Sequence, residues 1–291
     1  MNCDNPMNSF EKINYNIRPN KSIERKMICE ALSRLSFIDS LDKYRYIGFG
    51  SPFFADFSLF HKQLGLYDLI SIESAEDKKD RFEFNKPFSC IQIKYGKAST
   101  ILPNLELDKK KNIVWLDYDG TVESYMFGDI DTVIANTMAG SVFMLSLNVE
   151  PPKGDKEEKL KELIDKVGKQ RIPIEYQSAN LNTKKYIEVI YQMVDMQIKK
   201  SLLERNGNNE DKIDYIQIFN YIYKDGVNML TVGGIIYNQD QKKNINKMKL
   251  HEVAHIRSNS EQCRIQCPSL TYKEIQSLNN LLPCKIKTNK S

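Results

Sequence analysis

Residues 45–54, which read RYIGFGSPFF, decide the fold, because a short apolar run leads directly into a glycine-containing turn. Gly48 and Gly50 can adopt backbone conformations that other residues avoid, and they let a ligand approach the main chain closely. Ser51 and Pro52 suit the N-cap and the first turn of a following helix. Taken alone, the turn is equally compatible with a ligand site and with a capped strand-to-helix corner.

The rest of the chain continues the pattern of strand followed by helix. Apolar runs predict strands at 44–48, 68–73, 90–95, 112–116 and 141–148, with helical spacing in between, including one helix that ends at Gly65 and one within 122–137. Two later apolar runs meet at Asp225-Gly226, a strong hairpin signal. The sequence therefore predicts an α/β, Rossmann-like fold: a seven-stranded, mostly parallel sheet with a C-terminal antiparallel hairpin and helices on both faces.

Composition and spacing also suggest how the chain is divided. We expect an N-terminal arm and helix at 1–40, a Rossmann-like domain at 41–237 with a helical insertion at about 153–205, and a C-terminal extension at 238–291. In the N-terminal helix, Ser22 is the expected N-cap, and Arg25 and Lys26 are expected on the solvent side. Thr271 and Glu274 have the spacing of a capping box at the start of a last helix.

Charge and cysteine content narrow the class of protein. The net charge of +4 is too small to indicate a nucleic-acid partner, and no apolar run reaches the length of a membrane span. The N-terminus lacks the pattern of a signal peptide, and the six cysteines are dispersed. These features predict a cytoplasmic protein in a reducing compartment.

Polar and small residues follow the predicted parallel strands, at the edge where open α/β sheets bind ligands. Glu73 follows the second strand, where an acid can accept hydrogen bonds from the two hydroxyls of a ribose. Gly96, Lys97 and Ala98 form a turn of mostly small residues after the third strand. Asp117 and Asp119 follow the fourth, where they could orient a substrate, bind a cation or act as a general base, or simply form a turn.

The order and spacing of these turns resemble the class I S-adenosylmethionine-dependent methyltransferases. The segments IRPNKSIERKM, YIGFGSPFFADF, LISIE, RFEFNKPF, WLDYDG and PSLTYKEI are similar to a bacterial family described as "putative O-methyltransferases", over about residues 15–285. The resemblance implies methyl transfer from S-adenosylmethionine to an oxygen of an unknown acceptor. It also implies a set of cofactor-binding residues: Gly48, Phe49, Gly50, Ser51, Glu73, Ser74, Gly96, Lys97, Ala98, Asp117 and Tyr118.

Within this interpretation, Asp117 and Asp119 are the candidate catalytic residues. Arg18 and Lys21 are candidates for gripping an anionic substrate, although surface charges beside a helix start explain them equally well. Metal-assisted relatives carry a further acid after the fifth strand, where this chain has only Asn148. A magnesium site is therefore possible but not favoured, and no metal ligand is assigned.

Two alternative functions stay open. Tyr46 stands where an acid usually precedes the first glycine, and Pro52 takes the third glycine position, so the chain could be a degenerate methyltransferase-like subunit that binds a partner protein. Residues 251–255, HEVAH, satisfy the HExxH pattern of zinc hydrolases, and Cys263 and Cys267 lie nearby. A zinc site would need both histidines on one side of a helix, and the surrounding sequence does not favour one.

Overall fold

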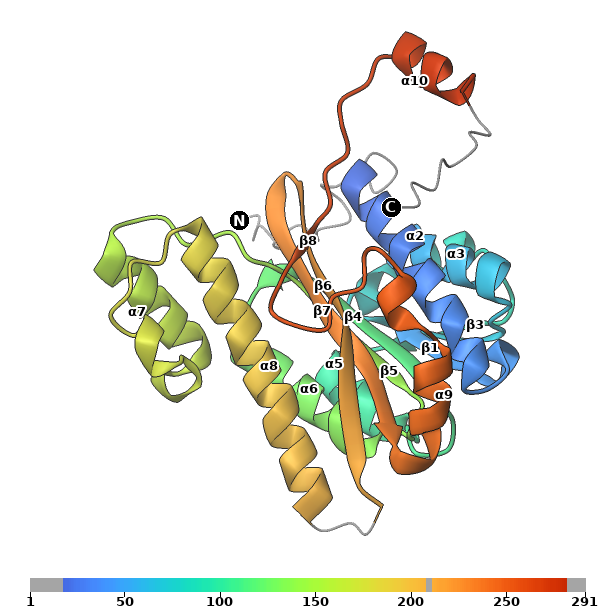
Figure 1. Cartoon of the computed structure of the whole chain (residues 1–291), viewed down its shortest axis with the longest axis horizontal. Helices are drawn as coiled ribbons and strands as arrows, with labels where there is room; N and C mark the ends of the chain where they lie inside the picture. The colour runs from blue at the N-terminus through green and yellow to red at the C-terminus, as the bar shows by residue number, and fades with distance from the viewer. Residues whose placement is uncertain (1–17, 208–210, 282–291) are drawn as a thin grey trace, which may run out of the picture.

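The computed structural model describes residues 18–207 and 211–281. Its centre is an eight-stranded sheet with the order β3-β2-β1-β4-β5-β7-β6-β8. Strands β1 to β5 are parallel to one another, and β7 runs antiparallel between β5 and β6 (Figure 1). The strands are β1 (Arg45–Gly48), β2 (Asp68–Glu73), β3 (Ile91–Tyr95), β4 (Asn112–Thr121), β5 (Val142–Asn148), β6 (Ile213–Asp225), β7 (Val227–Asn238) and β8 (Cys263–Arg264).

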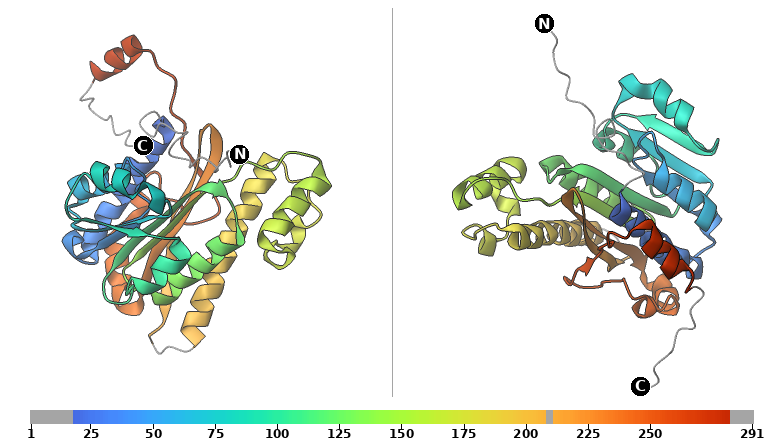
Figure 2. Two further views of the ribbon diagram at one scale, coloured as in Figure 1. Left: turned by 180° about the vertical axis from the view of Figure 1, so that it is seen from behind. Right: turned by 90° about the horizontal axis from the view of Figure 1, so that it is seen from above.

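Helices cover both faces of the sheet, as predicted. Successive strand residues point to opposite sides, and apolar residues on both sides are buried under helices. In β4, Val114 and Leu116 pack under α6 and α8, whereas Ile113 and Trp115 pack under α2 and α3. The views from behind and from above show the two helical layers with the sheet between them (Figure 2). The helices are α2 (Pro19–Ser33), α3 (Ala55–Leu64), α4 (Lys79–Asn85), α5 (Ala98–Ile101), α6 (Ser124–Asn136), α7 (Lys156–Val167), α8 (Thr183–Gly207), α9 (Lys242–Lys247) and α10 (Tyr272–Asn279).

Three local expectations need correction. The sheet has eight strands rather than seven, because the two residues of β8 pair with β6. Helix α2 begins at Pro19 and not after Ser22, since a proline loses no hydrogen bond in the first helical turn. Helix α3 begins at Ala55, so Ser51 and Pro52 belong to the preceding turn and do not cap the helix.

Strand β4 is longer than predicted, and its extension shapes the site. The sequence predicts that the strand ends at Leu116, but pairing with β5 continues to Thr121 through an irregularity between Asp117 and Thr121. Four residues of β4 advance while β5 advances by two, from Ser146 to Asn148. A bulge of this kind re-aims side chains that would otherwise alternate across the sheet.

The last segments lie outside the two layers or at their edge. The capping box of Thr271 and Glu274 starts α10, as predicted, and this helix stands away from the sheet at the end of a long connection (Figure 1). The proposed division into three parts remains a prediction, although β8 shows that the C-terminal extension contributes to the sheet. In the described ranges, every helix is too short or too polar to cross a membrane.

Candidate functional site

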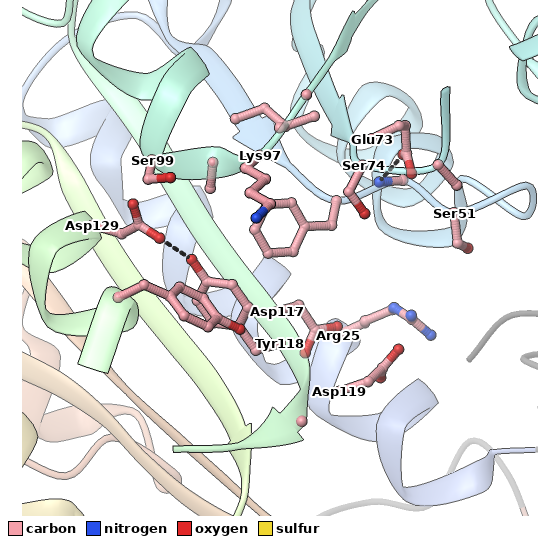
Figure 3. Close-up of a pocket in the computed structure, with 18 residues that line it drawn as sticks. Arg25, Ser51, Glu73, Ser74, Lys97, Ser99, Asp117, Tyr118, Asp119 and Asp129 are labelled. Atoms are coloured by element: carbon pink, nitrogen blue, oxygen red, sulfur yellow. Dashed lines mark hydrogen bonds between the residues drawn. The ribbon is translucent and has the colours of Figure 1, made fainter. Parts of the chain in front are cut away.

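A cavity of about 540 Å³ opens at the carboxyl ends of β1, β2, β3 and β4. The structure brings most of the predicted site residues together around it (Figure 3). These are Phe49, Gly50, Ser51, Glu73, Ser74, Gly96, Lys97, Ala98, Asp117, Tyr118 and Asp119. Gly48, Arg18 and Lys21 were predicted too, but they do not line the cavity.

Some lining residues were missed by the sequence analysis. They come from α2, β2, the turn after β2, α5, β4 and α6: Arg25, Ile72, Ala75, Ser99, Gly120, Tyr125 and Asp129. Ala75 and Ser99 directly extend predicted turns and could have been found by widening them. Arg25 and Asp129 had no signal of their own, because a single charged residue on an amphipathic helix usually faces solvent.

The turn between β1 and α3 is held against the end of β2. The backbone N–H of Gly50 donates to Glu73 Oε1 at 2.9 Å and to Ser71 Oγ at 3.0 Å. A Cβ on Gly50 would lie 2.6 Å from both Phe54 Cδ1 and Ser71 Oγ, so only glycine fits. Ser51 has a left-handed backbone with φ of 49°, which is uncommon for residues other than glycine. The turn is thus tightly fixed at the cavity wall.

Gly50→Ala should lower the free energy of unfolding by about 1–3 kcal/mol, because the added methyl group overpacks a fixed turn. Gly128, in the middle of α6, provides a matched control, since a Cβ there meets no atom within 4 Å. Gly128→Ala should instead raise stability by about 0.5–1 kcal/mol through helix propensity. Urea denaturation of both variants measures the two effects. A Gly50→Ala protein as stable as the Gly128→Ala protein would show that the turn adapts easily.

Glu73 is a buried acid that lines the cavity, only 7% exposed. Its Oε1 accepts hydrogen bonds from Gly50 N–H and, at 2.6 Å, from Ser71 Oγ. Burial nevertheless raises the pKa of Glu73 to about 7, and these hydrogen bonds only partly offset the burial. With a pKa of about 7, Glu73 is partly ionised at neutral pH. Its carboxylate at the end of β2 is well placed to accept hydrogen bonds from a pair of hydroxyl groups on a bound ligand.

Tyr46, which stands in place of an acid on β1, has its own carboxylate partner. Its hydroxyl donates to Asp56 Oδ2 on α3, and both side chains are buried. A Cβ on Gly48 would lie 2.5 Å from the Tyr46 hydroxyl oxygen, which explains the glycine at that position. Although β1 carries Tyr46 in place of an acid, a carboxyl group still lies close to the turn. It belongs to Asp56 on α3 and not to the strand.

Asp117 lines the cavity, and positively charged side chains surround its carboxylate. Burial alone would raise the pKa of Asp117, but the nearby charges of Lys21, Arg25 and Arg18 outweigh burial and hold the pKa below its usual value. Lys21 Nζ donates to Asp117 Oδ1 at 2.6 Å and lies 2.8 Å from Glu24 Oε2. A carboxylate stabilised in this way is a weak base.

The prediction that Lys21 binds a substrate is wrong in this arrangement. Its side chain has no exposed surface, and it is enclosed by Asp117, Glu24 and the ring of Trp115, whose centroid is 4.5 Å from Nζ. Lys21 positions Asp117 instead. Arg18 lies 3.8 Å from Asp119, which is 30% exposed, so a role for Arg18 toward substrate stays a prediction.

The Lys21 cluster continues into the sheet as a buried polar chain. Thr231 Oγ1 on β7 donates to Glu24 Oε1, and Thr231 and Ser146 on β5 share a hydrogen bond of 2.6 Å. Trp115 Nε1 donates to Ser146 Oγ at 2.8 Å. These bonds tie α2 to three strands beneath the cavity, so the position of Asp117 depends on the whole group.

An aromatic wall faces the cavity on the side of α6. The ring of Tyr118 packs edge-on against Phe49 and Tyr125, with centroids 5.1 Å and 5.8 Å away. The Tyr118 hydroxyl donates to Asp129 Oδ2 at 2.5 Å. Burial raises the pKa of Asp129, and its Oδ1 has no hydrogen-bond partner among the residues that the structure describes. This wall combines flat apolar surfaces with a buried acceptor.

Arg25 faces the cavity, so the expectation that it points to solvent is wrong. Arg18, Lys21 and Arg25 are spaced by three and four residues and therefore share one side of the chain at the start of α2. That side crosses the carboxyl end of β4. Arg25 is 9% exposed and lies with Ser51 and Asp119 at one end of the cavity, whereas Lys97 and Ser99 lie toward the other (Figure 3).

The HEVAH segment does not form the helix that a zinc hydrolase needs. Residues Leu250–Glu252 make a single 3-10 turn, and Val253 is already extended. The two ring nitrogens of His255 contact Tyr221 Oη at 2.7 Å and Glu30 Oε2 at 3.3 Å. Within 18–207 and 211–281, no three His, Cys, Asp or Glu side chains are grouped as metal ligands. The hydrolase alternative therefore lacks its geometry.

Comparisons with known proteins give remote structural likenesses and one family match. Solved structures similar to the chain include a putative O-methyltransferase from Klebsiella pneumoniae (11% identity, 79% of this chain and 91% of that one, TM-score 0.40). Another is the O-methyltransferase TomG from Streptomyces achromogenes in complex with SAM (14% identity, 70% and 79%, TM-score 0.36). A third is LepI in complex with SAM (12% identity, 66% of this chain, TM-score 0.36), of whose length the chain spans 43%.

These structural likenesses are too remote to carry a functional argument, and no curated protein matches the chain. The family described as "Putative O-methyltransferase", however, matches residues 13–291, nearly the whole sequence. This match shows that the chain belongs to the putative O-methyltransferase family.

Proposed function

We propose that the cavity binds S-adenosylmethionine and that the protein transfers its methyl group to an oxygen of an acceptor. The observation that carries the proposal is the position of Glu73, which lines the cavity at the end of β2 and is held by Gly50 and Ser71. Its carboxylate would accept hydrogen bonds from the two ribose hydroxyls. Membership of the putative O-methyltransferase family supports both the methyl donor and an oxygen as the acceptor atom.

The volume and the lining of the cavity suit such a ligand. Its volume of about 540 Å³ lies within the usual range of small-molecule sites, about 300–1,000 Å³. Gly50 has no side chain, and a Cβ there would collide with Phe54. A ligand beside Glu73 can therefore approach the main chain at this position. The turn at Lys97 and Ala98 would border the adenine. The open cavity also argues against the degenerate-subunit alternative, because a subunit that binds no cofactor would not need a cavity at the ends of these strands.

S-adenosylmethionine supplies an electrophilic methyl group when bound, and the protein's own task is positioning. Asp117 would stand beside the positive sulfonium as a fixed anion, since Lys21 keeps it ionised. Its lowered pKa makes it unsuited to removing a proton from the acceptor. Asp119, on the same strand and partly exposed, is the candidate for that role.

Calorimetric titration with S-adenosylhomocysteine, the product of methyl transfer, tests the proposal without knowledge of the acceptor. The wild-type protein should bind one molecule per chain at submillimolar ligand. Absence of binding at millimolar ligand would contradict the proposal. Retained binding by a Glu73→Ala variant would move the cofactor site elsewhere.

A further inference from the structure

Arg25 is a largely buried cation that lies near two acids but forms no direct hydrogen bond or ion pair with any residue that the structure describes. Its Nε is buried without a partner among those residues. It influences Asp56 and Asp117 only through space, by lowering the pKa of each against the effect of burial. Leaving the Nε–H of a guanidinium buried without a hydrogen bond is costly. Such a group is therefore expected to meet an anion that arrives with a ligand.

The position of Arg25 in the cavity indicates which anion this is. If Glu73 holds the ribose, the ligand extends from there in two directions. Lys97 and Ser99 occupy one end of the cavity, and Arg25 occupies the other with Ser51 and Asp119 (Figure 3). The first end borders the proposed adenine. The second end therefore faces the amino-acid part of the cofactor.

The charges at the second end match an amino acid in its zwitterionic form. Arg25 provides a planar cation with several N–H donors, the geometry that best fits a carboxylate. Asp117 and Asp119 line the cavity at the same end and provide negative charge for an ammonium group. A cation and acids side by side suit a ligand that carries both charges on one carbon.

We infer that Arg25 binds the carboxylate of the cofactor's methionine moiety, an inference that rests on the proposed function. The residue would fix the far end of the cofactor while Glu73 fixes its middle, so that the methyl group is held between them. Arg25 would thereby also select against nucleosides that lack the carboxylate.

Calorimetry with two ligands tests this inference: S-adenosylhomocysteine and its decarboxylated analogue, which keeps the ammonium. Wild-type protein should bind S-adenosylhomocysteine about 10- to 100-fold more tightly than the analogue, the usual effect of a charge-assisted hydrogen-bond pair. Arg25→Met should lose this preference by weakening S-adenosylhomocysteine alone. Arg25→Lys should keep part of it, since charge remains but the fork is lost. Lys26→Met, the next residue on α2 and outside the cavity, should match wild type.

The outcomes separate the two proposals. If wild-type protein binds neither nucleoside, the proposed cofactor is wrong, and the role of Arg25 fails with it. If wild-type protein binds both equally well, or if Arg25→Met weakens both to the same degree, the cofactor stands but the carboxylate assignment is overturned. Unchanged binding of S-adenosylhomocysteine by Arg25→Met would likewise overturn it. Thermal unfolding of each variant checks that a loss of preference is not a loss of fold.

Discussion

Replacing Lys21 with Met should lower the free energy of unfolding by about 3–5 kcal/mol, the usual cost of removing one partner from a buried ion pair. Lys21 is fully buried and serves two carboxylates, Asp117 at 2.6 Å and Glu24 at 2.8 Å. Met fills a similar volume, so packing is largely kept while both acids lose their counter-charge. The stability loss therefore reports electrostatics and not a cavity.

Urea denaturation at pH 7 measures this effect, with Lys26→Met on the same helix as the control. Adding Glu24→Gln to Lys21→Met should restore part of the stability, because one of the two uncompensated charges is then removed. Wild-type stability should also fall as the pH drops through the folded pKa of Asp117, which is lowered, since the ionised form is the one that Lys21 stabilises. A loss below about 1 kcal/mol would mean that water reaches the pair and screens it.

Replacing Glu73 with Gln should weaken S-adenosylhomocysteine binding by about 100-fold or more, because two charge-assisted hydrogen bonds to the ribose become weaker or unfavourable. Gln keeps the size of Glu and can still accept from Gly50 N–H and Ser71 Oγ through its carbonyl oxygen. Wild-type affinity should rise with pH through about 7, as Glu73 ionises. The variant should show no such rise. Glu76→Gln, an exposed acid just beyond the same strand, should behave like wild type.

The same Glu73→Gln variant should be more stable than wild type without ligand. The pKa of Glu73 is about 7 in the folded chain against an ordinary value of 4.5, so the folded state holds the proton more strongly. Wild-type stability therefore declines as the pH rises from about 4.5 to 7, by up to about 3 kcal/mol, whereas the variant has no proton to lose there. Denaturation should find the two alike near pH 4 and the variant ahead at pH 8. Equal stability of the two proteins at both pH values would contradict a Glu73 whose pKa is raised by burial.

Much of the fold was predictable because its signals are local. The strand at Asp68–Glu73 was predicted with its observed bounds, since a short apolar run flanked by acids has few other readings. The hairpin at Asp225-Gly226 was likewise specified by its turn residues. Site residues at strand ends followed from the same pattern, because parallel strands bring their carboxyl ends to one edge.

The features that the sequence did not reveal depend on how distant segments meet. The burial of Lys21 and Arg25 follows from α2 crossing the end of β4, where Lys21 meets a residue 96 positions away in the chain. The extension of β4 past Asp117 depends on a bulge against β5, and β8 depends on pairing with β6. No local periodicity encodes such contacts. From the sequence alone, the charged residues of α2 are therefore expected on a solvent-exposed face of the helix.

The most direct test of the account is a crystal structure of the protein with S-adenosylhomocysteine. We expect the nucleoside along the carboxyl ends of β1, β2, β3 and β4, with both ribose hydroxyls within hydrogen-bond distance of Glu73 and the adenine beside Lys97 and Ala98. A ligand found elsewhere on the molecule, or a ribose that leaves Glu73 without contact, would contradict it.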